Sequence, residues 1–157
     1  MEMKEKSQSR FVDILAKISI VVAAYLIIDG IMNLNFINTF KTSPEYRIAE
    51  QFMPSAIVSP TVTVIEIILQ ILGIAASVAM LKRLNWGRVL YISVLGLLSL
   101  SGIISSLRLH LSMSKYLDAF GLGSSLTMLI IWYLITIGIN GFIMWKLTTK
   151  EIRNEFV

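Results

Sequence analysis

The sequence predicts an all-α integral membrane protein, a four-helix antiparallel bundle with both termini in the cytoplasm. The composition is the first observation, because 55% of the 157 residues are hydrophobic and only 15% are charged. The second is a mean hydropathy of +0.74, and the third is a set of four long apolar stretches. Soluble domains carry about 25% charged residues. This shortage of charge excludes an ordinary soluble domain, a disordered chain and a nucleic-acid-binding module.

The four apolar stretches each have the length of a membrane span. They cover residues 18–36, 61–81, 89–107 and 125–147. A helix needs about 20 residues to cross the hydrocarbon core, and these stretches do not alternate as the strands of a membrane barrel do. We therefore expect one transmembrane domain over residues 1–157. The first stretch is longer than the apolar region of a signal peptide, so we expect an uncleaved first helix.

Cations are distributed unevenly around these spans. Ten lie on the side of the two termini and four on the opposite side. Because cytoplasmic loops carry the excess of Lys and Arg, this count predicts cytoplasmic termini. The ten are Lys4, Lys6, Arg10, Lys17, Lys82, Arg83, Arg88, Lys146, Lys150 and Arg153, and the four are Lys41, Arg47, Arg108 and Lys115.

The two outer connections, residues 39–60 and 108–124, are expected to lie on the membrane surface. Ser43, Pro44 and Glu45 form the pattern of a helix start, with a hydroxyl cap, a first-turn proline and an acid near the positive end. The sequence thus predicts a short interfacial helix in the first of these connections.

Two acids fall inside the predicted spans, and a charge near the bilayer centre costs about 2.5–3.5 kcal/mol. Asp29 follows Lys17 by twelve residues, which places it roughly 18 Å from the inner side at the helical rise of about 1.5 Å per residue. Glu66 follows Pro60 by six residues, roughly 9 Å from the outer side. We therefore expect the two carboxylates at a similar depth on neighbouring helices, unless Asp29 faces the outer aqueous edge.

Polar neighbours extend these acids into a predicted intramembrane polar cluster. Asn33 shares a helix face with Asp29, and Gln70 shares one with Glu66. Arg108 ends the third span on the outer side and is expected to turn toward the carboxylates. The cluster has three interpretations: a proton or cation site, a device that fixes helix register, or a contact for a partner helix.

Chemistry outside this cluster is sparse. The chain has no cysteine and one histidine, His110, so a cysteine-ligated or multi-histidine metal site is excluded. No catalytic pattern with credible spacing can be assembled, and we expect neither enzyme activity nor a cofactor. Asp13 and Lys17 are expected to form a solvated helix end.

The turn at residues 80–90, with the sequence MLKRLNWGRVL, resembles one found in many small bacterial four-span inner-membrane proteins. In those proteins a basic turn with Trp-Gly/Ala-Arg joins the middle helices. The resemblance implies a bacterial origin and a location in the plasma (inner) membrane. It implies no activity and no functional residue.

Two functions remain as the main expectations, and an intramembrane enzyme that uses the two acids without help from histidine is the third. The first is a non-enzymatic multi-pass protein that acts through helix–helix contacts in the lipid bilayer, as an accessory subunit, an assembly factor or an immunity-type protein. Its partner is then another membrane protein or a second copy of the chain. The alternative is a small oligomeric transporter or channel subunit with a proton or cation site at Asp29 and Glu66.

Overall fold

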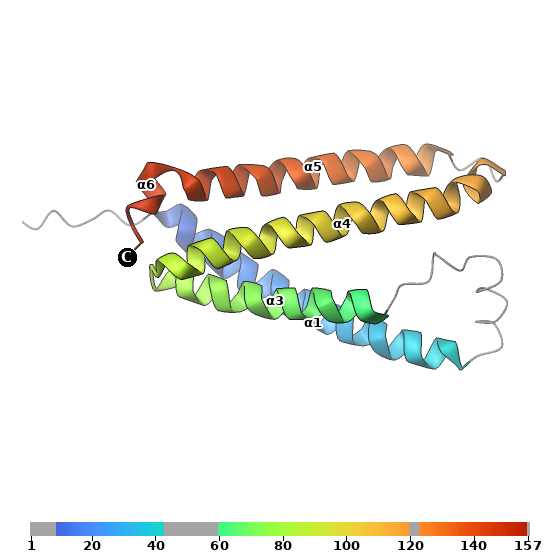
Figure 1. The fold of residues 1–157 in the computed structure, drawn as a ribbon, viewed down its shortest axis with the longest axis horizontal. Coiled ribbons are helices and arrows are strands. Elements are labelled where there is room, and N and C mark those ends of the chain that lie inside the picture. Colours follow the sequence, from blue (N-terminus) through green and yellow to red (C-terminus); the bar gives the residue numbers. More distant parts are fainter. Residues whose placement is uncertain (1–8, 43–59, 120–122, 157) are drawn as a thin grey trace, which may run out of the picture.

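A computed structural model describes residues 9–42, 60–119 and 123–156 of the chain. Within these residues the fold is all-α and contains no strand (Figure 1). The helices are α1 (Arg10–Lys41), α3 (Pro60–Leu81), α4 (Asn85–Ala119), α5 (Gly123–Thr148) and the short α6 (Lys150–Arg153).

Four of these helices contain segments that are long and apolar enough to cross a membrane, which confirms the predicted helical membrane class. The segments are Arg10–Lys41, Pro60–Leu81, Asn85–Ser105 and Ile131–Thr148.

Two helices extend beyond the predicted spans. Helix α1 has 32 residues and α4 has 35, so each is roughly 50 Å long. The helical structure of α4 thus continues past Arg108, where the outer connection was expected to begin, and reaches Ala119. Hydropathy marks the end of the apolar segment, whereas the helix continues into polar residues. The expected interfacial helix at residues 43–53 lies outside the described residues.

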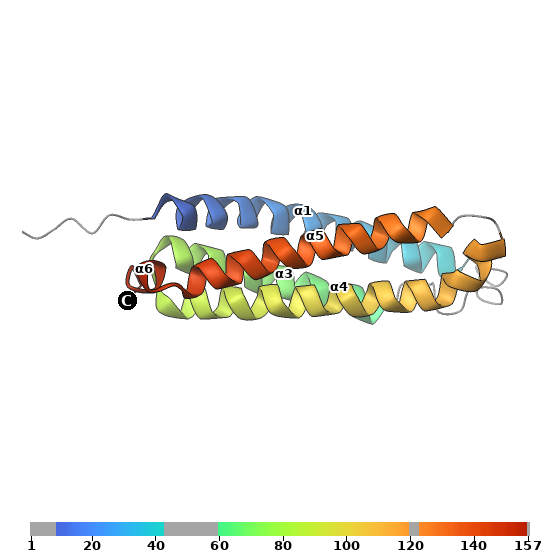
Figure 2. The ribbon, with the colours of Figure 1, turned by 90° about the horizontal axis from the view of Figure 1, so that it is seen from above.

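The helices pack in chain order, α1 along α3, α3 along α4 and α4 along α5 (Figures 1 and 2). On α1 the residues Ala16, Ala23, Gly30 and Ile37 are buried at intervals of seven, the spacing of a seam between supercoiled helices. A Cβ added at Gly30 would lie 2.9 Å from Cγ1 of Ile67. Small side chains therefore let α1 and α3 approach closely along this seam.

The turn between α3 and α4 is tight. The amide of Leu84 bonds the carbonyl of Ala79 at 3.0 Å, and the amide of Arg83 bonds that of Met80 at 2.9 Å. This is the Schellman arrangement that ends many helices, and its left-handed position is usually glycine. Here Arg83 occupies it with φ 57°. Gly87 then brings α4 against α3, because a Cβ there would lie 2.4 Å from that of Ala79.

A compact core forms where the start of α1, the turn at 82–84 and residues 147–156 meet; we call this region the basic end. Met80, Leu147 and Ile152 are fully buried there, and Phe156 closes the core from the C-terminal side. The C-terminal segment therefore belongs to the folded domain.

Candidate functional site

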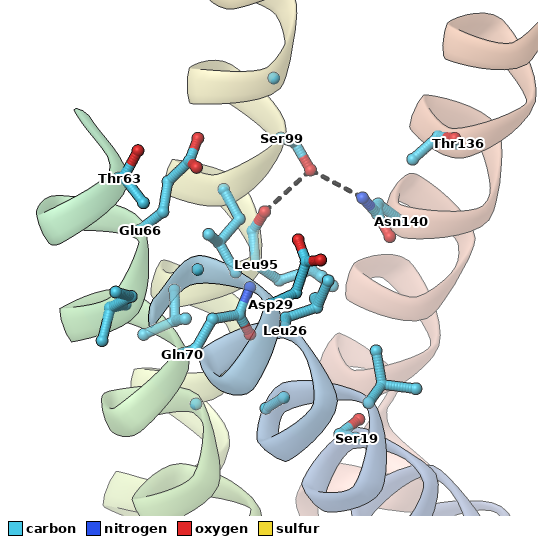
Figure 3. A pocket seen from close by; sticks show the side chains of 18 of the residues that line it. Ser19, Leu26, Asp29, Thr63, Glu66, Gln70, Leu95, Ser99, Thr136 and Asn140 are labelled. Carbon is cyan, nitrogen blue, oxygen red and sulfur yellow. Dashed lines mark hydrogen bonds between the residues drawn. The ribbon is translucent and has the colours of Figure 1, made fainter. Parts of the chain in front are cut away.

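A cavity of about 1080 Å³ lies among α1, α3, α4 and α5, each of which contributes lining residues. Figure 3 shows its polar side chains, with Asp29 from α1 and Asn140 from α5 directed into the space between the helices. The cavity exists because α5 packs along α4 without closing against α1.

The two carboxylates of the predicted spans lie at one level of this cavity. A Cβ added at Gly30, next to Asp29 in the chain, would meet the side chain of Ile67, which is next to Glu66. Asp29 thus sits beside the α1–α3 seam, and both acids line the cavity. Glu66 is half-buried, whereas Asp29 is exposed. Two carboxylates from neighbouring helices thus line one cavity.

Each carboxylate accepts a hydrogen bond from a different neighbour. The amide nitrogen of Asn33 donates to Oδ2 of Asp29 at 3.0 Å, within α1. The hydroxyl of Ser101 on α4 donates to Oε1 of Glu66 at 3.1 Å. These bonds orient the acids, but a carboxylate has about four lone-pair sites, so each can still bind another donor.

The structure brings four members of the predicted cluster to the cavity, since Asn33 and Gln70 line it together with Asp29 and Glu66. The fifth member, Arg108, is part of α4, but its side chain lies outside the described residues, as does that of His110.

Sequence reasoning missed the polar contacts that join α4 to its neighbours. Nδ2 of Asn140 donates to Oγ of Ser99 at 2.8 Å and links α5 to α4. Oγ of Ser19 and the hydroxyl of Tyr91 are 2.6 Å apart and link α1 to α4. All four residues line the cavity. An amide inside an apolar stretch was the available signal for Asn140.

A second polar network fixes the basic end, and it corrects the expectation for Asp13. This residue does not form a merely solvated helix end, because its carboxylate pairs with Nη2 of Arg83 at 2.8 Å. Nη1 of Arg83 lies 3.2 Å from Oε2 of Glu155, which also accepts the amide of Ser9 at 3.1 Å. Arg83 reaches both acids because the left-handed backbone at this position directs its guanidinium between α1 and the C-terminal segment.

Arg88 completes this network from the first turn of α4. Its guanidinium donates to Oδ1 of Asn85 at 2.9 and 3.1 Å and to the carbonyl of Leu147 at 3.1 Å. The ring of Phe156 lies between the two arginines, 5.9 Å from Cζ of Arg88 and 6.0 Å from that of Arg83. All four spanning helices are thereby joined at this end, while the cavity remains open between α1 and α5 farther along.

The charge of the cavity is one-sided. Among the described lining residues there are two acids and no Lys, Arg or His. The described part of the chain also holds no group of three or more residues suited to a metal ion. Fold and site thus define a helical membrane protein with an acidic cavity among its helices. No protein-family model, no curated protein and no solved structure matches the chain.

Proposed function

We propose that the protein is a small transporter or channel subunit that binds a cation or proton at Asp29 and Glu66. The observation that carries this proposal is the cavity itself, in which two carboxylates meet no described cation. Unpaired acids are costly at membrane depth and mark ion pathways in membrane proteins. A cation that enters the cavity balances the charge of these carboxylates.

In this proposal the four helices cross the plasma membrane of a bacterium as an antiparallel bundle. The basic end faces the cytoplasm, because eight of the ten cations counted for the inner side lie within its segments or close to them in the chain and cytoplasmic segments carry the excess of Lys and Arg. A reporter domain fused after Val157 tests this orientation. Reporter activity on the outer side of the membrane contradicts it.

Flux through proteoliposomes tests the function. The purified protein is reconstituted, a membrane potential is imposed, and proton, sodium and potassium fluxes are recorded separately. Glu66→Gln and Asp29→Asn are expected to abolish a flux that the wild-type protein supports, while each variant reconstitutes in the same amount.

Glu151→Gln is the matched control. It removes one negative charge from a side chain that is 85% exposed at the basic end, away from the cavity. The control is expected to retain wild-type flux. A wild-type flux that survives both cavity substitutions contradicts the proposal.

The open side of the cavity supports a second candidate, an accessory protein that acts through helix–helix contact. Trp132 and Leu134 on α5 are 67% and 63% exposed, so that helix has apolar surface to offer a partner. Mass spectrometry of the tagged protein, gently extracted from its membrane, separates the candidates. A stoichiometric second protein favours the accessory function, and a homo-oligomer without one favours the transporter.

A further inference from the structure

The cavity is far larger than an inorganic cation requires. Its volume of about 1080 Å³ lies just above the 300–1,000 Å³ of typical pockets for drug-sized ligands. A dedicated metal site instead surrounds the ion with several close oxygen or nitrogen ligands. No such group of three or more His, Asp or Glu side chains occurs in the part of the chain that the structure describes.

The walls of the cavity are suited to an organic molecule. More than half of the described lining residues are aliphatic or glycine, and nine polar side chains other than tyrosine are spread over all four helices. Tyr91 and Tyr133 add aromatic rings to this lining, and such rings attract organic cations through their faces. Apolar walls with a few placed polar groups are the usual character of a small-molecule pocket.

The cavity also opens sideways, between α1 and α5. Val22 and Phe36 line it from α1 while 48% and 65% exposed, and Ile137 and Ile139 line it from α5 while 41% and 55% exposed. These rim residues are apolar and belong to segments long enough to span a membrane. The opening thus faces the lipid, from which an amphipathic molecule enters without crossing a polar barrier.

We propose that the ligand of this cavity is an organic cation with an apolar body, which enters from the bilayer between α1 and α5. This inference rests on the proposed function and names its substrate class. The positive centre of the ligand lies between Asp29 and Glu66, and its apolar groups contact the aliphatic walls. The hydroxyl of Ser99 and the side-chain amide of Asn140 can form hydrogen bonds with ligands that also carry donors or acceptors.

Two probes of one shape and opposite charge test the ligand class. The full-length protein in lipid nanodiscs is equilibrated with radiolabelled tetraphenylphosphonium, a cation, or with tetraphenylborate, an anion, and empty nanodiscs give the background. Saturable binding of the cation alone is expected. Equal binding of both probes, or of neither, overturns the proposal without reliance on any variant.

Variants then locate the site. Asp29→Asn and Glu66→Gln are each expected to weaken tetraphenylphosphonium binding about tenfold, which corresponds to about 1.4 kcal/mol. Glu151→Gln is expected to bind as the wild type does. Saturable binding that both cavity variants retain overturns the proposal. The proposal is also overturned if the protein is a dimer in which the second copy covers the cavity and prevents the probe from binding.

The flux assay distinguishes the two possible failures. Carboxylate-dependent proton, sodium or potassium flux without tetraphenylphosphonium binding overturns the ligand class and leaves the proposed function standing. Absence of binding together with absence of carboxylate-dependent flux overturns both.

Discussion

Replacement of Arg83 by glutamine is expected to destabilise the protein strongly, because one guanidinium joins α1, the turn at 82–84 and the C-terminal segment. The substitution removes the ion pairs with Asp13 at 2.8 Å and Glu155 at 3.2 Å. It also removes the bond to the carbonyl of Ser9 at 3.3 Å and the contact with the ring of Phe156. The left-handed backbone at position 83 is no better suited to glutamine, so the substitution brings no compensating relief.

The burial of each partner sets the magnitude. The side chains of Arg83 and Glu155 are only 10% and 12% exposed, and loss of one partner from a buried pair costs about 3–5 kcal/mol. Asp13 is 39% exposed, so its pair adds about 1 kcal/mol or less. In the variant the amide of Ser9 still donates to the carboxylate of Glu155, which favours the lower end of the range of about 3–5 kcal/mol. We expect a loss of about 3 kcal/mol in the free energy of unfolding.

The assay is equilibrium unfolding in mixed detergent micelles by increasing sodium dodecyl sulfate. Lys82→Gln is the matched control, since it removes one cation from the same turn at an exposed position. Any effect of charge on membrane orientation is therefore equal in both variants, and the control is expected to unfold as the wild type does. Combining Arg83→Gln with Glu155→Gln should recover part of the loss. Equal destabilisation by Lys82→Gln and Arg83→Gln would refute the reasoning.

Two further substitutions test the helix contacts in the same unfolding assay. Gly87→Ala is expected to lower the free energy of unfolding by about 1–3 kcal/mol through overpacking, since its Cβ would meet that of Ala79 at 2.4 Å. Gly138→Ala is the control and should be neutral or stabilising, because no atom lies within 4 Å of its Cβ. Equal losses of stability in the two variants would contradict the close contact at Gly87. Tyr91→Phe is expected to cost about 0.5–1.5 kcal/mol through the lost bond to Ser19 at 2.6 Å, and this loss should vanish when Ser19 is already alanine.

The helices and the level of the two acids could be predicted from the sequence, because hydropathy and the helical rise depend only on order along the chain. The rotation of each helix could not. Apart from the faces that hold Asp29 with Asn33 and Glu66 with Gln70, the spans are apolar on all sides. No amphipathic stripe therefore indicates which face of the remaining surface meets which neighbour. The bonds Ser19–Tyr91 and Ser99–Asn140 depend on that rotation, and serines in a helix often bond their own backbone instead.

The polar network of the basic end could not be predicted from the sequence for a different reason. Arg83 and Arg88 fit the expected excess of cations near the cytoplasm, and that pattern accounts for both without any partner. Their burial follows from the left-handed turn at position 83 and from the return of the C-terminal segment. Glycine is the usual sign of such a turn, and because an arginine stands there instead, neither composition nor spacing indicated the turn.

The open cavity among the helices is lined by two carboxylates. Because the natural chain has no cysteine, single cysteines report on it directly. Ser99→Cys lies in the cavity, and Ser93→Cys lies on an exposed part of α4 outside it. The measurement is their rate of reaction, in nanodiscs, with methanethiosulfonates that carry a trimethylammonium or a sulfonate group.

A transport path also has to reach water, so both reagents are expected to enter the cavity. With each rate divided by the rate for a free thiol in solution, the cationic reagent is expected to react about tenfold or more faster than the anionic one at position 99. This preference should shrink when Asp29→Asn and Glu66→Gln are added. The cysteine at position 93, which faces lipid in this account, should react with neither reagent. Equal rates for both reagents at position 99, or a preference that persists without the two carboxylates, would contradict the account.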